Sequence, residues 1–525
     1  MRITNNIILH NTSSNINGNK INVDNLNQQM TSQKKIQRPS EDPVIAIRAL
    51  RLRSNLSEIE QYYERNIPDA ESWLDVTETA LSNMKTILTD IRTQCEYGAS
   101  DQITADDRKT ILTTLEKLRK QVYSEGNADY AGRTVFTGYR TNKKLTFMED
   151  EATTSYEISQ KFTYSDLEEH RYYGNEVTVP QTENDVLNGT IADHTHAAYQ
   201  RIRFGYGDIG KIDGETAGTV TDANNNTINV GKVELHYKDA AGTIPSPTIQ
   251  TTVYDTYEDW LAASGGSEYD IPDGEAVIIR HSGEMIFKND TAATVKNGEA
   301  QLEIKYTKTG FTNGEVRPEY YYDCKDVTDP NNVLEYKHFD DEGNVIYQDI
   351  NYVVAANQTL TVNTLAASVF DSAIGRDVDE MIDAVQYAMD ANQKVEDIEK
   401  MMKMDEYSSD ECQAKLESWL AAAKKEADYA DDNLQKLYNS YIGSFDGYLE
   451  GVVLAQTDVG SKGQSLDLTK NRMANQQTTM EELKSTNEDR ELSDIIIDYT
   501  SAYTAYQASL QAASKVNQVT LLSYL

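Results

Sequence analysis

Hydrophobic residues recur every seven positions in two long stretches, one toward each end of this chain. The first stretch contains Leu74, Leu81, Leu88 and Cys95. The second contains Val452, Val459, Leu466, Met473 and Met480. A seven-residue repeat places one hydrophobic stripe along a helix, and such a stripe is buried by packing against another helix. We therefore expect both flanks of the chain to form long helices that pair in a coiled-coil-like bundle.

The middle of the chain has a different composition. Runs of β-branched and aromatic residues, which favour strands, alternate there with glycine- and asparagine-rich turns. The sequence therefore predicts an α+β multidomain protein, in which residues 46–140 and 366–485 form a helical core and residues 141–365 form a β-rich outer insertion of one or two subdomains. The tyrosines of this insertion, such as those of EYYYD at 319–323, are expected to pack across strands.

Several residues predict where the helices of the core begin and end. Pro68 suits the first turn of a helix. Thr104, with Asp107 three residues later, predicts a capping box at the start of the next helix, which Gly126 would close. We expect these two helices to form an antiparallel pair. The glycines of GSFDG, residues 443–447, predict a turn within the C-terminal flank.

The terminal segments, residues 1–45 and 486–525, are predicted to behave differently from the core. Nine asparagines lie between positions 5 and 27, and asparagine is a poor helix former because its side chain competes for backbone hydrogen bonds. We expect both segments to be disordered in the free chain and to pair as helices in an assembly. The residues expected at this assembly interface are Ile16, Val23, Leu26, Met30, Leu492, Ile496, Tyr499, Tyr503, Tyr506 and Leu510.

Charge and hydropathy exclude two classes of partner. The chain carries 85 acidic and 49 basic residues, a formal net charge of −36, so it would repel nucleic acid and anionic membranes. No apolar run approaches the ~20 residues of a transmembrane helix, and the N-terminus has no ordinary secretory signal. We therefore expect no nucleic-acid partner and no membrane partner.

The sequence contains no motif for catalysis. It has no phosphate-binding glycine loop, no nucleophile elbow and no zinc-protease motif. The three cysteines are too scattered for a disulfide framework, and Cys95 continues a hydrophobic stripe, so we expect it to be buried. His194 and His196 form a His-x-His pair without a third ligand nearby, and we expect a solvent-exposed loop there. No catalytic, metal or cofactor-binding residue is assigned, and we expect no enzymatic activity.

The segment LNQQMTSQKKIQRPSEDPVIAIRAL, residues 26–50, resembles the N-terminal signature of the flagellin superfamily. The residues that match its Pro-Ser-Asp-Asp-Pro-like motif are Pro39, Ser40, Asp42 and Pro43. This chain departs from the family pattern at Glu41, where aspartate is usual, and at Gln33, where glycine is usual. Ser40 or Asp42 is able to cap the helix that follows.

Other stretches resemble members of this family that join the flagellar hook to the filament. Residues 127–141 carry a Gly-Arg-x-x-Phe-x-Gly-Tyr motif, residues 503–525 end in Leu-Leu-x-Tyr-Leu, and residues 459–495 resemble the last core helix. The residues that match the first of these motifs are Gly132, Arg133, Phe136, Gly138 and Tyr139. The resemblance covers roughly the first 140 and the last 160 residues, and it implies nothing about the insertion.

The resemblance implies an extracellular structural protein of the bacterial flagellum, which joins hook to filament by self-assembly into a ring-like tier. Family members pass unfolded through the flagellar type III export channel without a cleaved signal peptide. The implied partners are further copies of the chain, a hook-side adaptor junction protein, flagellin and a flagellar export chaperone, with no cofactor. Two alternatives stay open: a filament-forming flagellin with a large surface domain, and an adhesive or ligand-binding role of the insertion.

Overall fold

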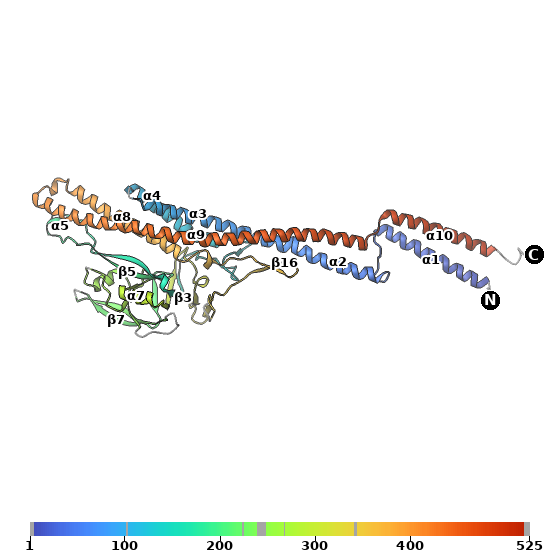
Figure 1. Cartoon of the computed structure of the whole chain (residues 1–525), viewed down its shortest axis with the longest axis horizontal. Coiled ribbons are helices and arrows are strands. Elements are labelled where there is room, and N and C mark those ends of the chain that lie inside the picture. The colour runs from blue at the N-terminus through green and yellow to red at the C-terminus, as the bar shows by residue number, and fades with distance from the viewer. Residues whose placement is uncertain are drawn as a thin grey trace, which may run out of the picture. The chain divides into compact units, whose positions relative to one another are not determined.

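The computed structural model describes residues 5–100, 103–222, 225–238, 248–266, 268–340 and 344–518. The chain divides into two compact units. The terminal unit comprises Met1–Glu71, Asn351–Thr361 and Lys462–Leu525, and the central unit comprises Ser72–Ile350 and Val362–Ser461. Helices dominate the terminal unit, while the central unit combines helices with strands, so the fold class is α+β as predicted (Figure 1).

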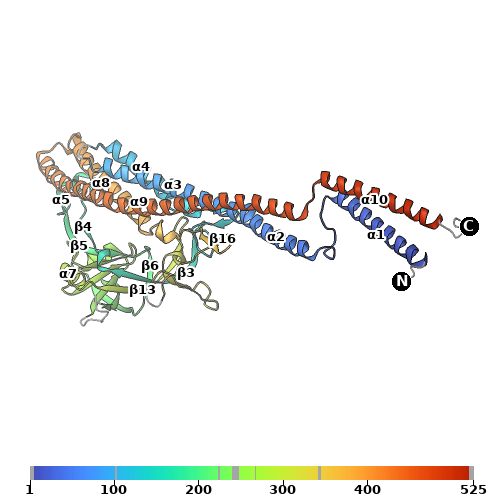
Figure 2. The ribbon, with the colours of Figure 1, turned by 45° about the vertical axis from the view of Figure 1, so that its right-hand side comes forward.

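Helices from both ends of the chain build the terminal unit. They are α1 (Asn5–Ser32), α2 (Pro43–Gln61), α10 (Leu492–Gln518) and the last part of α9 (Asp410–Glu488). Helices α1 and α10 lie side by side and run in opposite directions (Figures 1 and 2). A hairpin of β16 (Asn351–Ala355) and β17 (Gln358–Thr361) joins this unit, where the side chain of Asn66 donates a 2.7 Å hydrogen bond to the carbonyl of Val353.

Pro68 lies in the first turn of α3 as predicted, but no break in the helix precedes it. Helix α2 continues into a π-helical turn, η1 (Tyr62–Asn66), and then into α3 (Ile67–Gly98). In this turn the N–H of Ile67 donates to the carbonyl of Tyr62, five residues earlier instead of four. Proline lacks an N–H and clashes with the carbonyl four residues before it. The wider turn lets the helix continue past Pro68.

The long helices of the central unit are α3, α4 (Ala105–Gln121), α8 (Ala373–Met401) and the first part of α9. The heptad stripe of α3, including Cys95, is buried as predicted, and Thr104 forms the predicted capping box with Asp107. Helix α4 packs against α8, where Arg119 makes a bidentate ion pair with Asp379 at 2.7 and 2.8 Å. It also runs back along α3 as expected (Figure 1), and Asn83 of α3 donates a 3.0 Å hydrogen bond to Glu125, just after the end of α4. Helix α4 ends at Gln121, before the predicted Gly126.

The predicted turn at residues 443–447 is also wrong, because α9 continues through this segment as a helix of 79 residues. Each glycine inside a helix costs about 1 kcal/mol relative to alanine. Burial of one large apolar side chain contributes about 1.5–3 kcal/mol. Phe445 and Val452 are both fully buried, so tertiary packing outweighs the cost of Gly443 and Gly447.

The insertion contains two larger β-sheets. Its main strands are β3 (Glu151–Thr163), β4 (Glu168–Gly174), β5 (Thr195–Arg203), β6 (Ile209–Ile212), β7 (Thr216–Thr221), β8 (Thr227–Leu235), β10 (Ile249–Tyr254), β11 (Glu275–Ile279), β12 (Glu284–Phe287), β13 (Gln301–Phe311), β14 (Asp323–Asp326) and β15 (Leu334–Tyr336). One sheet has seven strands in the order β4-β5-β12-β11-β10-β8-β7. The other has six, in the order β15-β14-β3-β13-β6 with the short β9 (Tyr237–Lys238) also paired to β13. Neighbouring strands are antiparallel, except that β10 and β11 are parallel.

Aromatic side chains fill the cores of both sheets. Tyr172 packs edge-on against Trp260 beneath the seven-stranded sheet, with ring centres 5.3 Å apart. Phe147 stacks on Phe311 of the six-stranded sheet at 4.5 Å. The tyrosines at 320 and 321 are buried, so they pack inside the protein as expected, although they lie in and just after the 3-10 helix η4 (Pro318–Tyr320) and not on a strand.

Candidate assembly site

The hydrophobic stripe predicted on the N-terminal segment faces inward in the terminal unit. Its residues on α1 are Ile16, Val23, Leu26 and Met30, all buried or half-buried. On α10, the inward positions follow the same spacing of four and three residues, from Ile495 through Tyr499 and Ala502 to Tyr506. Ile495 is fully buried, although the sequence analysis did not select it. The structure therefore brings the two terminal stripes together, with Tyr499 and Tyr506 as the predicted α10 members of the contact.

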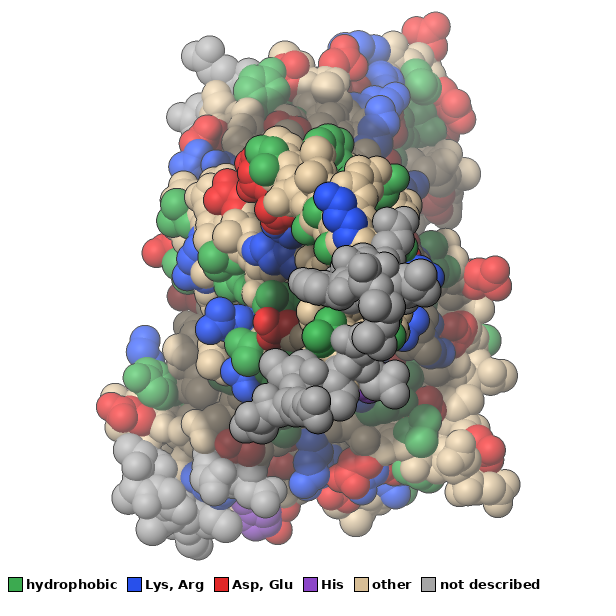
Figure 3. Space-filling model, turned by 90° about the vertical axis from the view of Figure 1, so that its right-hand side faces the viewer, with side chains coloured by type: hydrophobic (Ala, Val, Ile, Leu, Met, Phe, Trp, Pro, Cys, Tyr) green, Lys and Arg blue, Asp and Glu red, His purple; other side chains and the backbone are tan. Residues whose placement is uncertain are grey.

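The other four residues predicted on α10 form a second stripe, which flanks the inward stripe and is more exposed. We call Leu492, Ile496, Tyr503 and Leu510 the outer stripe. These side chains are 42–46% exposed, even though they are as hydrophobic as the inward set. A second exposed row on α2 contains Val44, Ile47 and Leu50, each more than half exposed. Figure 3 shows hydrophobic side chains exposed among charged ones on the face it presents. Exposed apolar surface of this extent is typical of an interaction site.

Next to the α1–α10 pair, the link between α1 and α2 meets the link between α9 and α10. We call this contact between the two links the joint. Gln33 follows α1 with a φ of +56°, a left-handed conformation, and its N–H closes the helix on the carbonyl of Gln29 at 2.7 Å. The N–H of Lys35 donates to the carbonyl of Glu488 at 2.7 Å, and the N–H of Arg490 donates to the carbonyl of Gln33 at 2.9 Å. The links α1–α2 and α9–α10 therefore hold each other through backbone hydrogen bonds.

The residues of the Pro-Ser-Glu-Asp-Pro motif end this joint and begin α2. Asp42 is the residue that caps the helix, because its carboxylate accepts hydrogen bonds from the N–H groups of Val44 at 2.9 Å and Ile45 at 3.1 Å. Pro43 occupies the first helical position, where a missing N–H costs nothing. Pro39 and Ser40 lie in the exposed turn before the cap. Of the two residues that the sequence left open, Asp42 thus takes the capping role.

A nearly buried carboxylate ties the joint to α2. Glu488 accepts two hydrogen bonds from Arg53, at 2.8 and 2.6 Å, and Lys34 lies 3.5 Å away. The hydrogen bonds from Arg53 hold the pKa of Glu488 below its usual range, and the charges of Arg53 and Lys34 act in the same direction. The joint therefore favours an ionised glutamate.

Replacing Gln33 with glycine is expected to increase the helix content of the terminal segments. A non-glycine residue in the left-handed region costs about 1–2 kcal/mol, and glycine gives back about 0.5–1 kcal/mol through greater flexibility of the unfolded chain. The net gain of up to about 1 kcal/mol can be measured by circular dichroism of the free chain. Ser32→Gly, one residue earlier and inside α1, is the matched control and should decrease helix content.

Lowering the pH is expected to open the joint. Because the pKa of Glu488 is depressed in the folded state, its contribution is present above the ordinary glutamate range near 4.3 and is lost as the pH falls through that range. Amide hydrogen exchange at Lys35 and Arg490 reports this opening. Glu488→Gln should speed exchange at neutral pH and make it less dependent on pH, whereas Glu482→Gln, at an exposed position of α9, should behave like the parent chain.

The Gly-Arg-x-x-Phe-x-Gly-Tyr segment lies in the central unit, where α4 gives way to the insertion. Gly132 and Gly138 adopt left-handed φ values of +78° and +59° that glycine tolerates. Arg133 lies over the ring of Trp73 at 5.1 Å, and buried Phe136 packs edge-on against Phe370. Tyr139 is exposed. Apart from Tyr139, these residues pack or adopt turn conformations in the segment that connects α4 to the insertion.

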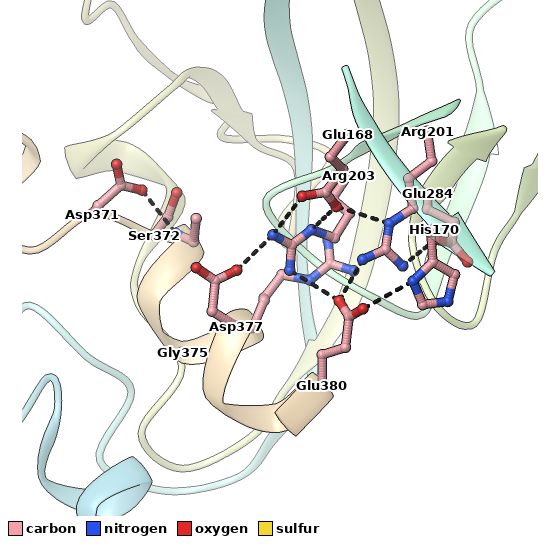
Figure 4. Close-up of polar contacts among 12 residues, drawn as sticks. Glu168, His170, Arg201, Arg203, Glu284, Asp371, Ser372, Gly375, Asp377 and Glu380 are labelled. Carbon is pink, nitrogen blue, oxygen red and sulfur yellow. Dashed lines mark hydrogen bonds and ion pairs between the residues drawn. The ribbon is translucent and has the colours of Figure 1, made fainter. Parts of the chain in front are cut away.

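A buried ion network connects the insertion to α8 within the central unit (Figure 4). Arg201 of β5 contacts Glu168 at 2.8 Å, Glu284 of β12 at 2.9 Å, and Glu380 of α8. The neighbouring Arg203 reaches Asp377 of α8 at 2.5 Å. The network therefore links three strands to one helix through side chains that are largely removed from water.

Burial and pairing act in opposite directions on the acids of this network. Burial alone would raise the pKa of Glu380, but Arg201, His170 and Arg203 hold it well below its usual range. For Asp377, burial prevails over the attraction of Arg203 and raises the pKa to about 6. Glu380 thus depends strongly on its arginines for staying charged.

The His-x-His pair does not lie in an exposed loop as expected. His194 is buried and its ring stacks on Tyr173, with centres 5.5 Å apart, while His196 lies on β5 and is exposed. Burial lowers the pKa of His194, which favours the neutral ring. Among the described residues, no group of three His, Cys, Asp or Glu side chains is arranged to hold a metal ion. Within the same residues, no helix combines the length and hydrophobicity needed to cross a membrane.

Parts of this sequence are similar to known flagellar proteins. Residues 3–141 match the model of the bacterial flagellin N-terminal helical region. The chain is 26% identical over 195 residues to flagellar hook-associated protein 3 of Salmonella typhimurium, covering 37% of this chain and 60% of that protein. It is 29% identical over 116 residues to the Escherichia coli protein of the same name, covering 22% and 36%. The matched regions therefore span less than two thirds of either relative.

Solved structures of flagellar proteins also align with the chain. The FlgL protein of Xanthomonas campestris aligns with a TM-score of 0.30 and 12% identity, over 82% of this chain and 98% of that one. The flagellar junction protein FlgL of Legionella pneumophila aligns with a TM-score of 0.29 and 11% identity, over 85% and 100%. TM-scores this low carry no argument about this chain.

The N-terminal part of the chain, residues 3–141, is thus similar to the helical region of bacterial flagellins. Among curated proteins, parts of the chain are similar to flagellar hook-associated protein 3.

Proposed function

We propose that the chain is an exported structural protein of the bacterial flagellum that joins hook to filament by assembling with copies of itself into a ring-like tier. The observation that carries this proposal is the outer stripe of α10. One hydrophobic face of α10 packs against α1 of the same chain. Leu492, Ile496, Tyr503 and Leu510 of the outer stripe remain exposed. A neighbouring copy would cover this surface in a closed assembly.

The proposed partners follow from this position in the flagellum. They are further copies of the chain, a hook-side adaptor, flagellin above the tier, and an export chaperone before assembly. The names of the curated relatives support a flagellar role, since both are hook-associated proteins. We propose a purely structural role without enzymatic activity, in which the two terminal segments need each other, or neighbouring copies, to become ordered.

Immunogold labelling of whole flagella tests the junction role. Label confined to the point between hook and filament, together with a trace band in sheared filaments, is the expected result. Label along the filament and an abundant band would instead support the alternative of a filament-forming flagellin. Rapid amide exchange of α1 and α10 in the free chain, slowed in the assembly, would support assembly-coupled ordering, and slow exchange in both states would contradict it.

A further inference from the structure

The outward face of the six-stranded sheet forms an open groove of about 720 Å³. Side chains from β3, β6, β13, β14 and β15 line it, and the segment that follows β15 forms one edge. Its volume falls within the ~300–1,000 Å³ typical of ligand sites. The groove lies entirely within the insertion and takes no part in the proposed assembly surface.

Donors and acceptors alternate across the floor of this groove. Lys325 lies in register between Glu335 on one neighbouring strand and Glu157 on the other. On the next strand pair, Lys161 stands opposite Glu303. Registered partners of this kind have Cβ atoms about 4.5–5.5 Å apart. The groove therefore presents closely spaced groups that donate hydrogen bonds next to groups that accept them.

The charges of the groove nearly cancel, which distinguishes it from the acidic chain as a whole. Five lysines line it, at positions 161, 211, 305, 325 and 337, against six carboxylates at 157, 213, 303, 323, 335 and 340. The chain as a whole carries 85 acidic and 49 basic residues. A groove of balanced charge has no strong field for an anion or a cation, so it favours a neutral polar ligand.

Hydrophobic surface is available at the edge of the groove. Tyr336 and Phe339 line this edge and are half-buried. Lys161 covers one side of the Phe339 ring, with its ammonium 5.1 Å from the ring centre. Aromatic edges beside alternating donors and acceptors suit a molecule with hydroxyl groups on its rim and C–H groups on its faces.

We propose that this groove binds a neutral oligosaccharide. Each sugar hydroxyl both donates and accepts a hydrogen bond, so a row of hydroxyls pairs with the alternating lysines and carboxylates, while the C–H face of a ring packs on Tyr336 or Phe339. Hydrogen bonds between neutral hydroxyls and charged side chains are stronger than those between neutral groups. This proposal is independent of the junction role, because it uses only residues of the insertion.

Isothermal titration of the full chain with defined sugars tests the proposal. The probes are cellotetraose, maltotetraose and chitotetraose as neutral ligands, trigalacturonate as an acidic ligand, and pentalysine and pentaglutamate as peptides. At least one neutral tetrasaccharide is expected to bind. Lys325→Ala and Glu157→Gln should each weaken that binding about tenfold, because each removes a hydrogen bond to a charged group.

Lys232→Ala is the matched control, since Lys232 is an exposed strand lysine of the seven-stranded sheet and lies outside the groove. It should leave the affinity unchanged. Absence of binding by every neutral sugar would overturn the proposal, as would binding of trigalacturonate or a peptide alone. Equal affinity in the parent, Lys325→Ala and Glu157→Gln chains would also overturn it, because the ligand would then lie elsewhere.

Discussion

Aspartate at both Ile496 and Tyr503 is expected to abolish assembly while leaving the α1–α10 pair intact. Both side chains belong to the outer stripe and are 46% and 43% exposed, so the charges cost little in the free chain. Covering them with a neighbouring copy would bury two unpaired carboxylates, which costs at least several kcal/mol. Sedimentation of the purified chain under assembling conditions, and counts of attached filaments on cells making only this variant, measure the effect.

The control for this experiment carries the same charges on another side of the same helix. Thr500→Asp with Gln507→Asp has the same seven-residue spacing at exposed polar positions and should assemble like the parent chain. A third variant, Ile495→Asp, places a charge in the buried contact with α1 and should disrupt the pair itself. Normal assembly of the Ile496→Asp, Tyr503→Asp chain would show that the outer stripe is not an assembly surface.

Replacing Arg201 with methionine is expected to destabilise the central unit by about 3–5 kcal/mol. Arg201 is 6% exposed and faces Glu168, Glu284 and Glu380, so its loss leaves carboxylates buried with fewer partners. Urea unfolding followed by tryptophan fluorescence measures this change, since Trp260 lies in the core of the seven-stranded sheet. Hydrogen exchange of β4, β5 and β12 should rise together, because these strands share the network.

Two further variants separate the network from a general effect of losing an arginine. Arg171→Met removes a half-exposed arginine that pairs with Asp432 at 3.0 Å, and it should cost less than about 1 kcal/mol. Arg201→Met combined with Glu284→Met should recover part of the lost stability, since a buried ion pair is often replaceable by apolar side chains. If Arg201→Met and Arg171→Met unfolded at the same urea concentration, the buried network would not stabilise this unit.

Local sequence patterns predicted the elements that depend on short-range chemistry. The α3 stripe is buried, Thr104 and Asp107 form a capping box, and the tyrosines of 319–323 pack inside the insertion. The prediction of a turn at residues 443–447 failed because buried neighbours keep α9 helical there. At Pro68 a π-helical turn joins α2 to α3 without the break that the sequence suggested. The network around Arg201 and Glu380 had no local pattern, since its members lie 179 positions apart.

The hydrophobic stripes of α1 and α10 show most clearly what local sequence predicts and what tertiary packing decides. The sequence by itself determined that each end forms a helix with apolar residues at intervals of three and four, and that the ends suit each other. It did not determine which side of α10 meets α1. Three consecutive isoleucines, 495–497, begin more than one equally regular series, so periodicity alone does not select between them. Only the tertiary structure made that choice, because the contact with α1 buries Ile495 and leaves Ile496 exposed.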